Sequence, residues 1–389
     1  MTTDRSLRIL FAVQGEGRGH MTQALALAPM LRRAGYQILG ATVSASHRQS
    51  VPAFFRDGLG APVHLLSAPT FEADAHGRIH LGRTVWAGLR SARSTSASLD
   101  ALAGLLDEHE PDVIVSFFDA LTGLYGLLRP SDAPVVAVGH QFMFEYPEYP
   151  FAPGQPLQRA AMRGYTRALG ASAETRLALS FYDAEVPREG TVVMPPLLRP
   201  EVLAMNGAKD DGSLLVYLME PALASVLARW SDCHPGVPIH CFTAMEPRVH
   251  SEALTFHALS GTDFLRRMAV CRGVVCTAGF ESVSEAMWLG KPVCMAPTPG
   301  HYEQRCNARD AATEGAGLAV DDLETGLDAF LRYLPTHATR PEPFRAWVRK
   351  AEGDVVREIE RAAGLPRLSV HLGDGAPEVL PALTARSAS

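Results

Sequence analysis

The segment Gln14-Gly15-Glu16-Gly17-Arg18-Gly19-His20 separates a short apolar run at residues 8–13 from an apolar pattern of helical spacing at residues 21–34. A buried strand, a glycine-rich turn and a helix in this order predict a βα unit of a parallel sheet. The three glycines allow a tight turn and a close approach of a ligand to the helix N-terminus, where free N–H groups and the helix dipole favour negative charge. The segment therefore predicts an anion-binding loop.

His20 stands at the mouth of this loop, directly after its last glycine. It is either a functional imidazole or a helix N-terminal side chain that only bonds backbone. The glycine spacing differs from the dinucleotide pattern G-x-G-x-x-G, and no acidic residue follows the second predicted strand, which argues against a nicotinamide cofactor. We therefore take His20 as the first candidate catalytic residue.

Short apolar runs alternate with helical patterns along the chain, which indicates parallel strands joined by crossover helices and covered on both faces. The clearest runs lie at residues 8–13, 112–118, 134–138, 177–182, 214–218, 239–243, 273–276 and 292–295. A chain of 389 residues fits two α/β domains. A proline-rich, polar break places the boundary between them. We predict a first domain at residues 1–190, a linker at 191–212, a second domain at 213–345, and a C-terminal helix with a flexible tail at 346–389.

The composition is that of an ordinary globular protein, with 47% hydrophobic residues, 20% charged residues and a formal net charge of −6. This balance does not favour a nucleic-acid partner. The N-terminal apolar run is too short for a signal sequence or a membrane span, and the six cysteines form no C-x-x-C pair. We expect a cytoplasmic protein with reduced, mostly buried thiols.

A second motif, Cys276-Thr277-Ala278-Gly279-Phe280-Glu281-Ser282-Val283-Ser284-Glu285-Ala286, follows another predicted strand. We expect the strand to end at Thr277, Gly279 to make the turn, and Ser282 to open a helix whose amide groups hold a diphosphate. The alternative is a plain helix cap of the form Ser-x-x-Glu.

Three side chains beyond this turn are placed to read hydroxyl groups. The Glu285 carboxylate, one helical turn further on, is placed to accept two hydrogen bonds from a ribose. Glu303 and Gln304 follow the next strand and a proline-glycine loop, and offer an acceptor beside an amide. Sugars are recognised by such hydrogen bonds.

These motifs resemble those of GT-B glycosyltransferases close to the lipid-linked N-acetylglucosaminyltransferase of peptidoglycan synthesis, the plant monogalactosyldiacylglycerol synthases and the UDP-glycosyltransferases. The resemblance covers residues 8–365 and rests on Gly15-x-Gly17-x-Gly19-His20, on residues 278–285, on Glu303-Gln304 and on Asn307-Ala308. It implies an α/β fold of GT-B architecture, in which two Rossmann-like, doubly wound parallel-sheet domains face each other across a cleft.

The resemblance also implies roles for single residues. His20 is expected to be the general base on the acceptor hydroxyl, and the second domain is expected to hold the donor, a nucleotide-diphosphate sugar with UDP as its nucleotide. The donor-binding residues so implied are Thr277, Gly279, Ser282, Glu285, Glu303 and Gln304.

Two positions depart from the family pattern. Thr277 stands where many members have a histidine, and Glu281 stands where they have an asparagine. An unpaired carboxylate at Glu281 would repel the donor phosphate. We therefore expect it to point away or to pair with one of the basic residues Arg305, Arg309 and His301.

We predict a metal-independent, inverting glycosyltransferase that moves a hexose from a nucleotide-diphosphate sugar to a hydroxyl acceptor, either lipid-linked or a small molecule. No D-x-D motif or His/Cys cluster accompanies the motifs, so neither a metal ion nor a cofactor beyond the nucleotide sugar is expected. The alternatives are a nucleotide-sugar hydrolase or 2-epimerase of the same fold, and a non-catalytic sugar-nucleotide-binding protein.

Further candidates follow predicted strands at the sheet edge that bears His20. Asp119 either orients the His20 imidazole or simply caps the next helix. His140 is the alternative base and, with Phe142 and Phe144, is predicted to contact the acceptor; for the aromatic residues core packing is the alternative.

Residues 78–93 alternate arginines with apolar side chains. A peripheral contact with the cytoplasmic face of an anionic membrane is one interpretation, and a solvated helix face is the other.

Overall fold

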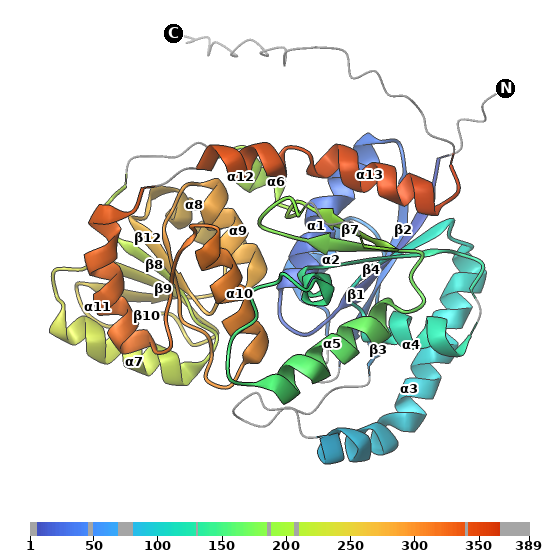
Figure 1. Ribbon diagram of the computed structural model, residues 1–389, viewed down its shortest axis with the longest axis horizontal. Coiled ribbons are helices and arrows are strands. Elements are labelled where there is room, and N and C mark those ends of the chain that lie inside the picture. The colour runs from blue at the N-terminus through green and yellow to red at the C-terminus, as the bar shows by residue number, and fades with distance from the viewer. Residues whose placement is uncertain are drawn as a thin grey trace, which may run out of the picture.

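The computed structural model describes residues 6–45, 50–68, 81–129, 131–184, 188–205, 210–338 and 341–365, with the backbone alone for residues 81–92. Two α/β lobes lie side by side, each built on one seven-stranded sheet flanked by helices (Figure 1). The predicted fold class, two doubly wound α/β domains, is confirmed.

The first sheet is parallel throughout and runs in the order β3-β2-β1-β4-β5-β6-β7. Its strands are β1 (Arg8–Gln14), β2 (Gln37–Ala45), β3 (Val63–Ser67), β4 (Val113–Phe117), β5 (Val135–Gly139), β6 (Thr175–Leu179) and β7 (Thr191–Met194). Every residue of β4 and β5 is buried, as expected for strands covered on both faces. The order reverses between β1 and β4, which makes the sheet doubly wound.

The second sheet runs in the order β10-β11-β9-β8-β12-β13-β14 and is parallel except for its β10–β11 edge pair. Its strands are β8 (Leu214–Tyr217), β9 (Ile239–Phe242), β10 (Arg248–Val249), β11 (Leu254–His257), β12 (Gly273–Cys276), β13 (Val293–Met295) and β14 (Gly317–Ala319). Here the order reverses between β8 and β12.

Helices connect the strands in both lobes. The first lobe contains α1 (Gly19–Arg33), α2 (Ala53–Leu59), α3 (Leu81–His109), α4 (Ala120–Leu128), the short 3-10 helix η1 (His140–Glu145) and α5 (Pro156–Gly170). The second lobe follows α6 (Pro200–Leu203) and contains α7 (Pro221–Cys233), α8 (Gly261–Val270), α9 (Phe280–Trp288), α10 (Tyr302–Thr313), α11 (Leu323–Tyr333) and η2 (Leu334–Thr336).

The predicted C-terminal helix is two helices, α12 (Pro341–Val348) and α13 (Ala351–Ala362), which tie the lobes together. α12 packs on α9 of the second lobe, and α13 returns to α1 and to β5, β6 and β7 of the first (Figure 1). Trp347 Nε1–H donates to the Ser180 carbonyl at 3.0 Å, and Val355 and Ile359 are fully buried.

The linker is shorter than the predicted span of residues 191–212. Residues 191–194 form β7, because this apolar run pairs in parallel with β6. Pro195 and Pro196 follow directly and cannot continue the ladder, since proline has no N–H to donate.

All six cysteines are free, and Cys233 alone among them is exposed.

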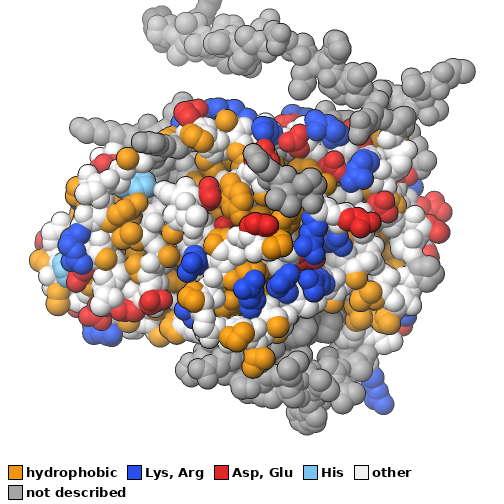
Figure 2. All heavy atoms as spheres, viewed as in Figure 1, with side chains coloured by type: hydrophobic (Ala, Val, Ile, Leu, Met, Phe, Trp, Pro, Cys, Tyr) orange, Lys and Arg blue, Asp and Glu red, His pale blue; other side chains and the backbone are white. Residues whose placement is uncertain are grey.

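Two observations concern the expected contact with a membrane. No helix in the described part of the chain is long and apolar enough to cross a bilayer. Figure 2 shows Lys and Arg side chains gathered over α5, which carries Arg159, Arg163 and Arg167 at intervals of about one helical turn. For the basic segment at residues 78–93, residues 78–80 and the side chains of 81–92 lie outside what the structure describes, so its contact with a membrane stays a prediction.

The first loop glycine is required by close packing. A Cβ at Gly15 would lie 2.7 Å from Ala45 Cβ and 2.8 Å from the Ser44 carbonyl oxygen, whereas a Cβ at Gly19 would meet Glu281 Cγ at 3.6 Å, an ordinary contact. We predict that Gly15→Ala lowers the free energy of unfolding by about 1–3 kcal/mol. Gly19→Ala should change it by less than about 1 kcal/mol. Urea unfolding measures both, and equal stabilities would contradict the steric role of Gly15.

Candidate active site

A cleft of about 670 Å³ lies between the lobes, at the carboxyl ends of their central strands. Its walls come from the glycine loop, the end of β4, η1 and α5 on one side, and from the loops after β8 and β12 and the start of α10 on the other. The predicted site residues that line it are Gly17, Gly19, His20, His140, Gly279, Ser282, Glu285, Glu303 and Gln304. Those that do not are Gly15, Asp119, Phe142, Phe144 and Thr277.

His20 is the second residue of α1 and lies on the cleft wall. Its ring stacks on Phe118, with 5.9 Å between the ring centroids, and its Nδ1 lies 3.3 Å from Gln23 Oε1. Burial lowers the pKa of His20 below its ordinary value of 6.5, while the Glu303 carboxylate and the Gln23 hydrogen bond raise it. The imidazole is therefore mainly neutral at pH 7 and able to accept a proton.

Asp119 caps α4. Its Oδ2 accepts hydrogen bonds from the Thr122 N–H at 2.8 Å and from the Thr122 hydroxyl at 2.7 Å. The preceding residue, Phe118, has a φ of 52°, and it is the Phe118 ring that lies against His20. The geometry matches the helix-cap alternative, and a role for Asp119 in orienting His20 stays a prediction.

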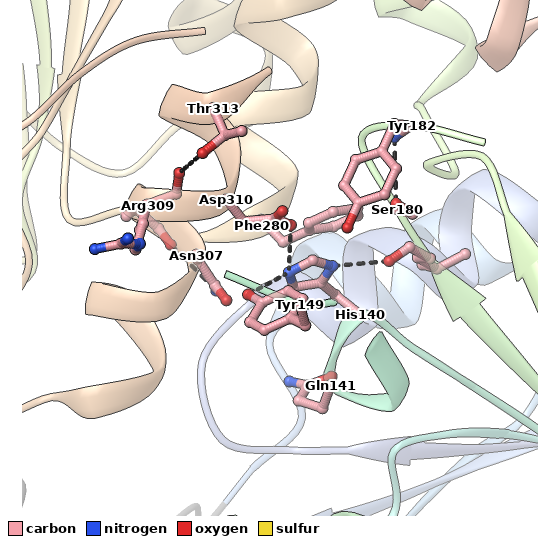
Figure 3. Close-up of polar contacts among 12 residues, drawn as sticks. His140, Gln141, Tyr149, Ser180, Tyr182, Phe280, Asn307, Arg309, Asp310 and Thr313 are labelled. Carbon is pink, nitrogen blue, oxygen red and sulfur yellow. Dashed lines mark hydrogen bonds and ion pairs between the residues drawn. The ribbon is translucent and has the colours of Figure 1, made fainter. Parts of the chain in front are cut away.

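His140, the alternative base, is enclosed by protein groups on both ring nitrogens (Figure 3). Nδ1–H donates to the Leu179 carbonyl at 2.7 Å, and Nε2 lies 3.4 Å from the Tyr149 hydroxyl and 3.7 Å from Asp310 Oδ2. Its ring stacks on Phe280 of the second lobe at 4.2 Å. Burial lowers the pKa of His140 to about 4. Because both nitrogens face protein, His140 is the weaker candidate for a base.

The predicted stacking of Phe142 and Phe144 on an acceptor is wrong. Both side chains are fully buried in an aromatic cluster that also contains Tyr302 of α10. The aromatic run fills the space between the lobes, so core packing explains it. Phe118 and Tyr165 line the first-lobe wall of the cleft instead.

The predicted anion site is the N-terminus of α9. This helix begins at Phe280 with Gly279 as N-cap, and no side chain caps it, so its first N–H groups can bind a ligand. Ala278, with a φ of 61°, makes the turn that was predicted for Gly279. Ser282 lies within the first turn of the helix, which excludes the Ser-x-x-Glu cap. Thr277 is buried behind the loop.

Glu281, the second residue of α9, turns toward the first lobe. Its Oε1 accepts a hydrogen bond from Gln23 Nε2–H at 2.6 Å. Burial raises the pKa of Glu281 to about 8; the Gln23 hydrogen bond and Arg199 lower it, and Glu285 raises it. Sequence reasoning missed Gln23, because a lone glutamine on a helix carries no pattern. Within the described chain, no hydrogen bond or ion pair joins Glu281 to its predicted partners Arg305, Arg309 and His301.

Glu285 forms a bidentate ion pair with Arg199, with N–O distances of 2.7 and 2.8 Å. The Arg199 side chain is 19% exposed and the Glu285 side chain 3% exposed, and both residues line the cleft. Arg199 lies in the linker, at the N-cap of α6. Sequence reasoning missed it, although it is the one charged residue in the proline-rich run at residues 195–200.

Glu303 and Gln304 lie at the start of α10, where each already has a protein partner. Glu303 Oε1 accepts from Gln141 Nε2–H at 3.0 Å, and Gln304 Oε1 accepts from the Thr298 N–H at 2.8 Å. The Gln304 side chain therefore has its Nε2–H groups to offer a ligand, while the Glu303 carboxylate has a second oxygen.

Sequence reasoning also missed the apolar end of the cleft. Tyr217 and Phe242 are the last residues of β8 and β9, and their ring centroids lie 5.4 and 5.5 Å from that of Phe264 on α8. All three line the cleft. The sequence signal for this end of the cleft is an aromatic residue at the end of each of two parallel strands. The three rings offer flat surfaces to a planar ligand.

Two doubly wound lobes that meet at the carboxyl ends of their strands, with a cleft between them, have the GT-B architecture of glycosyltransferases. The model of glycosyl transferase family 1 matches residues 7–335, and the chain belongs to this family. It is a glycosyltransferase of the GT-B type.

Known proteins agree with this assignment. The chain is 26% identical over 396 residues to a UDP-N-acetylglucosamine--N-acetylmuramyl-(pentapeptide) pyrophosphoryl-undecaprenol N-acetylglucosamine transferase of Rhodospirillum rubrum. The match covers 95% of this chain and 91% of that protein. Its fold is similar to that of the kitacinnamycin glycosyltransferase, with a TM-score of 0.62 and 17% identity over 93% of this chain and 100% of that one. A spinosyn rhamnosyltransferase complexed with thymidine diphosphate has a TM-score of 0.56 and 17% identity over 91% of this chain and 100% of that one.

The Arg199–Glu285 pair should be energetically coupled, because neither charge is well solvated. In a double-mutant cycle of Arg199→Met and Glu285→Gln, we predict a coupling free energy of unfolding of about 1–3 kcal/mol. The matched control is the Arg33–Glu352 pair, whose side chains are 54% and 46% exposed. Its coupling should stay below about 1 kcal/mol. Equal coupling in the two cycles, measured by urea unfolding, would contradict a structural role for Arg199.

Proposed function

We propose that the chain is a metal-independent, inverting transferase that moves a sugar from a UDP sugar to a hydroxyl acceptor, with His20 as the general base. The observation that carries the proposal is the shared cleft. His20 of the first lobe and the uncapped N-terminus of α9 in the second lobe line the same cavity. A base and an anion site on opposite walls are what a single displacement on a sugar diphosphate requires.

The donor is assigned to the second lobe. The free N–H groups and the dipole of α9 favour a diphosphate, and the aromatic rings of Tyr217, Phe242 and Phe264 offer a stacking surface for a base. Glu285 and Glu303 supply acceptors for ribose and sugar hydroxyls. UDP is favoured because the Rhodospirillum rubrum relative is named for UDP-N-acetylglucosamine.

Glu281 is compatible with a phosphate at this helix end. Its side chain is directed at Gln23, and its pKa of about 8 means that most of the carboxyl is protonated at pH 7. A neutral carboxyl does not repel a diphosphate as a carboxylate would.

In the proposed reaction, His20 Nε2 takes the acceptor proton while the acceptor oxygen attacks the anomeric carbon. The bond from that carbon to the diphosphate breaks in the same step, which inverts the configuration, and the diphosphate leaves against the α9 N-terminus. The imidazolium that forms is stabilised by the Glu303 carboxylate, which raises the pKa of His20. The acceptor is assigned to the wall formed by Phe118 and Tyr165.

Replacing His20 tests the proposal. We predict that His20→Ala lowers kcat by about 10²–10⁴-fold and leaves donor affinity nearly unchanged, because the base and the donor belong to different lobes. Turnover assays and calorimetric titration with UDP measure the two quantities. Full activity in the variant would contradict the proposal. Donor hydrolysis without an acceptor, lost in the same variant, would favour a hydrolase.

Metal independence has its own test, since the N-terminus of α9 is assigned the work that a divalent cation does in other sites. Transfer should be retained in an excess of chelator, and added magnesium or manganese should change the rate little. An absolute requirement for either ion, measured in the same turnover assay, would contradict the proposed chemistry.

The pH dependence should report His20. Because its pKa is lowered from 6.5, the neutral base is present at pH 7, and the acid limb of kcat/KM should have its midpoint below pH 6.5. Glu303 raises this pKa, so Glu303→Gln should move the midpoint to lower pH, and Glu303→Asp, which keeps the charge, should move it less. A shift to higher pH in Glu303→Gln would contradict the placement of the carboxylate beside the base.

A further inference from the structure

His20, Gln23 and Glu281 form one chain of hydrogen bonds across the cleft. His20 Nδ1 lies 3.3 Å from Gln23 Oε1, and Gln23 Nε2–H donates to Glu281 Oε1 at 2.6 Å. All three side chains line the cleft, and Gln23 and Glu281 are 2% and 8% exposed. Little bulk water is therefore available to replace either bond.

The direction of the two hydrogen bonds follows from which atoms can donate and which can only accept. Glu281 Oε1 accepts from Gln23 Nε2–H, and it can do so in both protonation states, because a neutral carboxyl carries its proton on the other oxygen, Oε2; the NH₂ end of the Gln23 amide therefore faces Glu281. The carbonyl end of the amide then faces His20 Nδ1. Because a carbonyl oxygen also only accepts, Nδ1 must carry the proton, which leaves the lone pair on Nε2.

We infer that Gln23 and Glu281 are positioning residues that fix the His20 imidazole in its Nδ1–H tautomer, so that Nε2 is the basic nitrogen. This inference rests on the proposed function, which assigns the base to His20. In the other tautomer Nε2 carries the proton and cannot remove one from an acceptor.

The two hydrogen bonds also link the His20 tautomer to the contact between the lobes. His20 and Gln23 belong to α1 of the first lobe, and Glu281 belongs to α9 of the second. α1 and α9 pack against each other here, and a Cβ at Gly19 would meet Glu281 Cγ at 3.6 Å, an ordinary contact. The carboxyl group that orients the amide is thus present only when α1 and α9 face each other. The contact between α1 and α9 therefore does two things: it makes Nε2 of His20 the basic nitrogen, and it brings the anion site to the cleft.

Other charged groups lie close to His20, Gln23 and Glu281, and a test must leave these groups unchanged. Glu285 raises the pKa of Glu281 and Arg199 lowers it, while Glu303 raises the pKa of His20. Burial places the pKa of Glu281 at about 8. At pH 9 the Glu281 carboxyl is therefore mostly ionised and can only accept, so the orienting bond is unambiguous at that pH.

The test is ¹⁵N NMR of histidine-labelled protein at pH 9, which distinguishes protonated from unprotonated ring nitrogens. The His20 signals are identified by their absence in His20→Gln. We expect the wild-type protein to carry the proton on Nδ1. In Gln23→Met the acceptor for Nδ1–H is gone, and in Glu281→Gln the new amide can donate as well as accept, so both variants should shift toward a mixture of tautomers. Thr22→Ala, a change at the neighbouring residue on α1, should keep the wild-type tautomer.

Kinetics separate positioning from a loss of fold. Gln23→Met and Glu281→Gln preserve side-chain size, so their melting curves should stay close to the wild type. Each should lower kcat by roughly 10-fold, less than the loss expected on removing a base, with little change in UDP affinity. A wild-type proton on Nε2, or an unchanged tautomer in both variants, would overturn the inference. Activity that survives His20→Ala would overturn the proposed function instead, and the NMR result would still decide how His20 is oriented.

Discussion

The fold depends on one constraint, which is that each sheet reverses its strand order where a glycine-containing turn leads into a helix. In a parallel sheet the carboxyl ends of all strands share one edge, and the crevice opens where the order reverses. That point lies between β1 and β4 in the first lobe and between β8 and β12 in the second. Since α1 and α9 begin there, their N-termini face the same cleft, and His20 and Glu281 are brought together.

Beside the aromatic cluster that contains Phe144 and Tyr302, buried polar groups contribute to the contact between the lobes. His140 and Asp310 lie 3.7 Å apart across the interface (Figure 3), and burial lowers the pKa of the first and raises that of the second to about 8. A neutral pair avoids the cost of an unpaired buried charge. Arg199 and Glu285 are joined by two short hydrogen bonds, at 2.7 and 2.8 Å. The charge beside the base comes from Glu303, which raises the pKa of His20.

The sequence predicted the elements whose signal is local. The apolar runs that became β1, β4, β8 and β12, and the glycine turns after two of them, mark the sheets and the cleft, because strand burial and turn chemistry are set by neighbouring residues. What it did not predict depends on tertiary contact. Phe144 is the residue type expected in a binding loop, but it is fully buried in an aromatic cluster that also contains Tyr302 of α10. Glu281 meets a glutamine 258 residues away, which no local pattern can indicate.

The central claim is that the N-terminus of α9 holds the diphosphate of the donor and faces His20 across the cleft. Backbone hydrogen exchange with and without UDP tests it most directly, because a phosphate that accepts from free amides slows their exchange. The account predicts slower exchange at residues 279–285 of α9, together with residues 217–219 at the aromatic end of the cleft. Protection confined to the glycine loop at residues 14–20, with α9 unchanged, would contradict it.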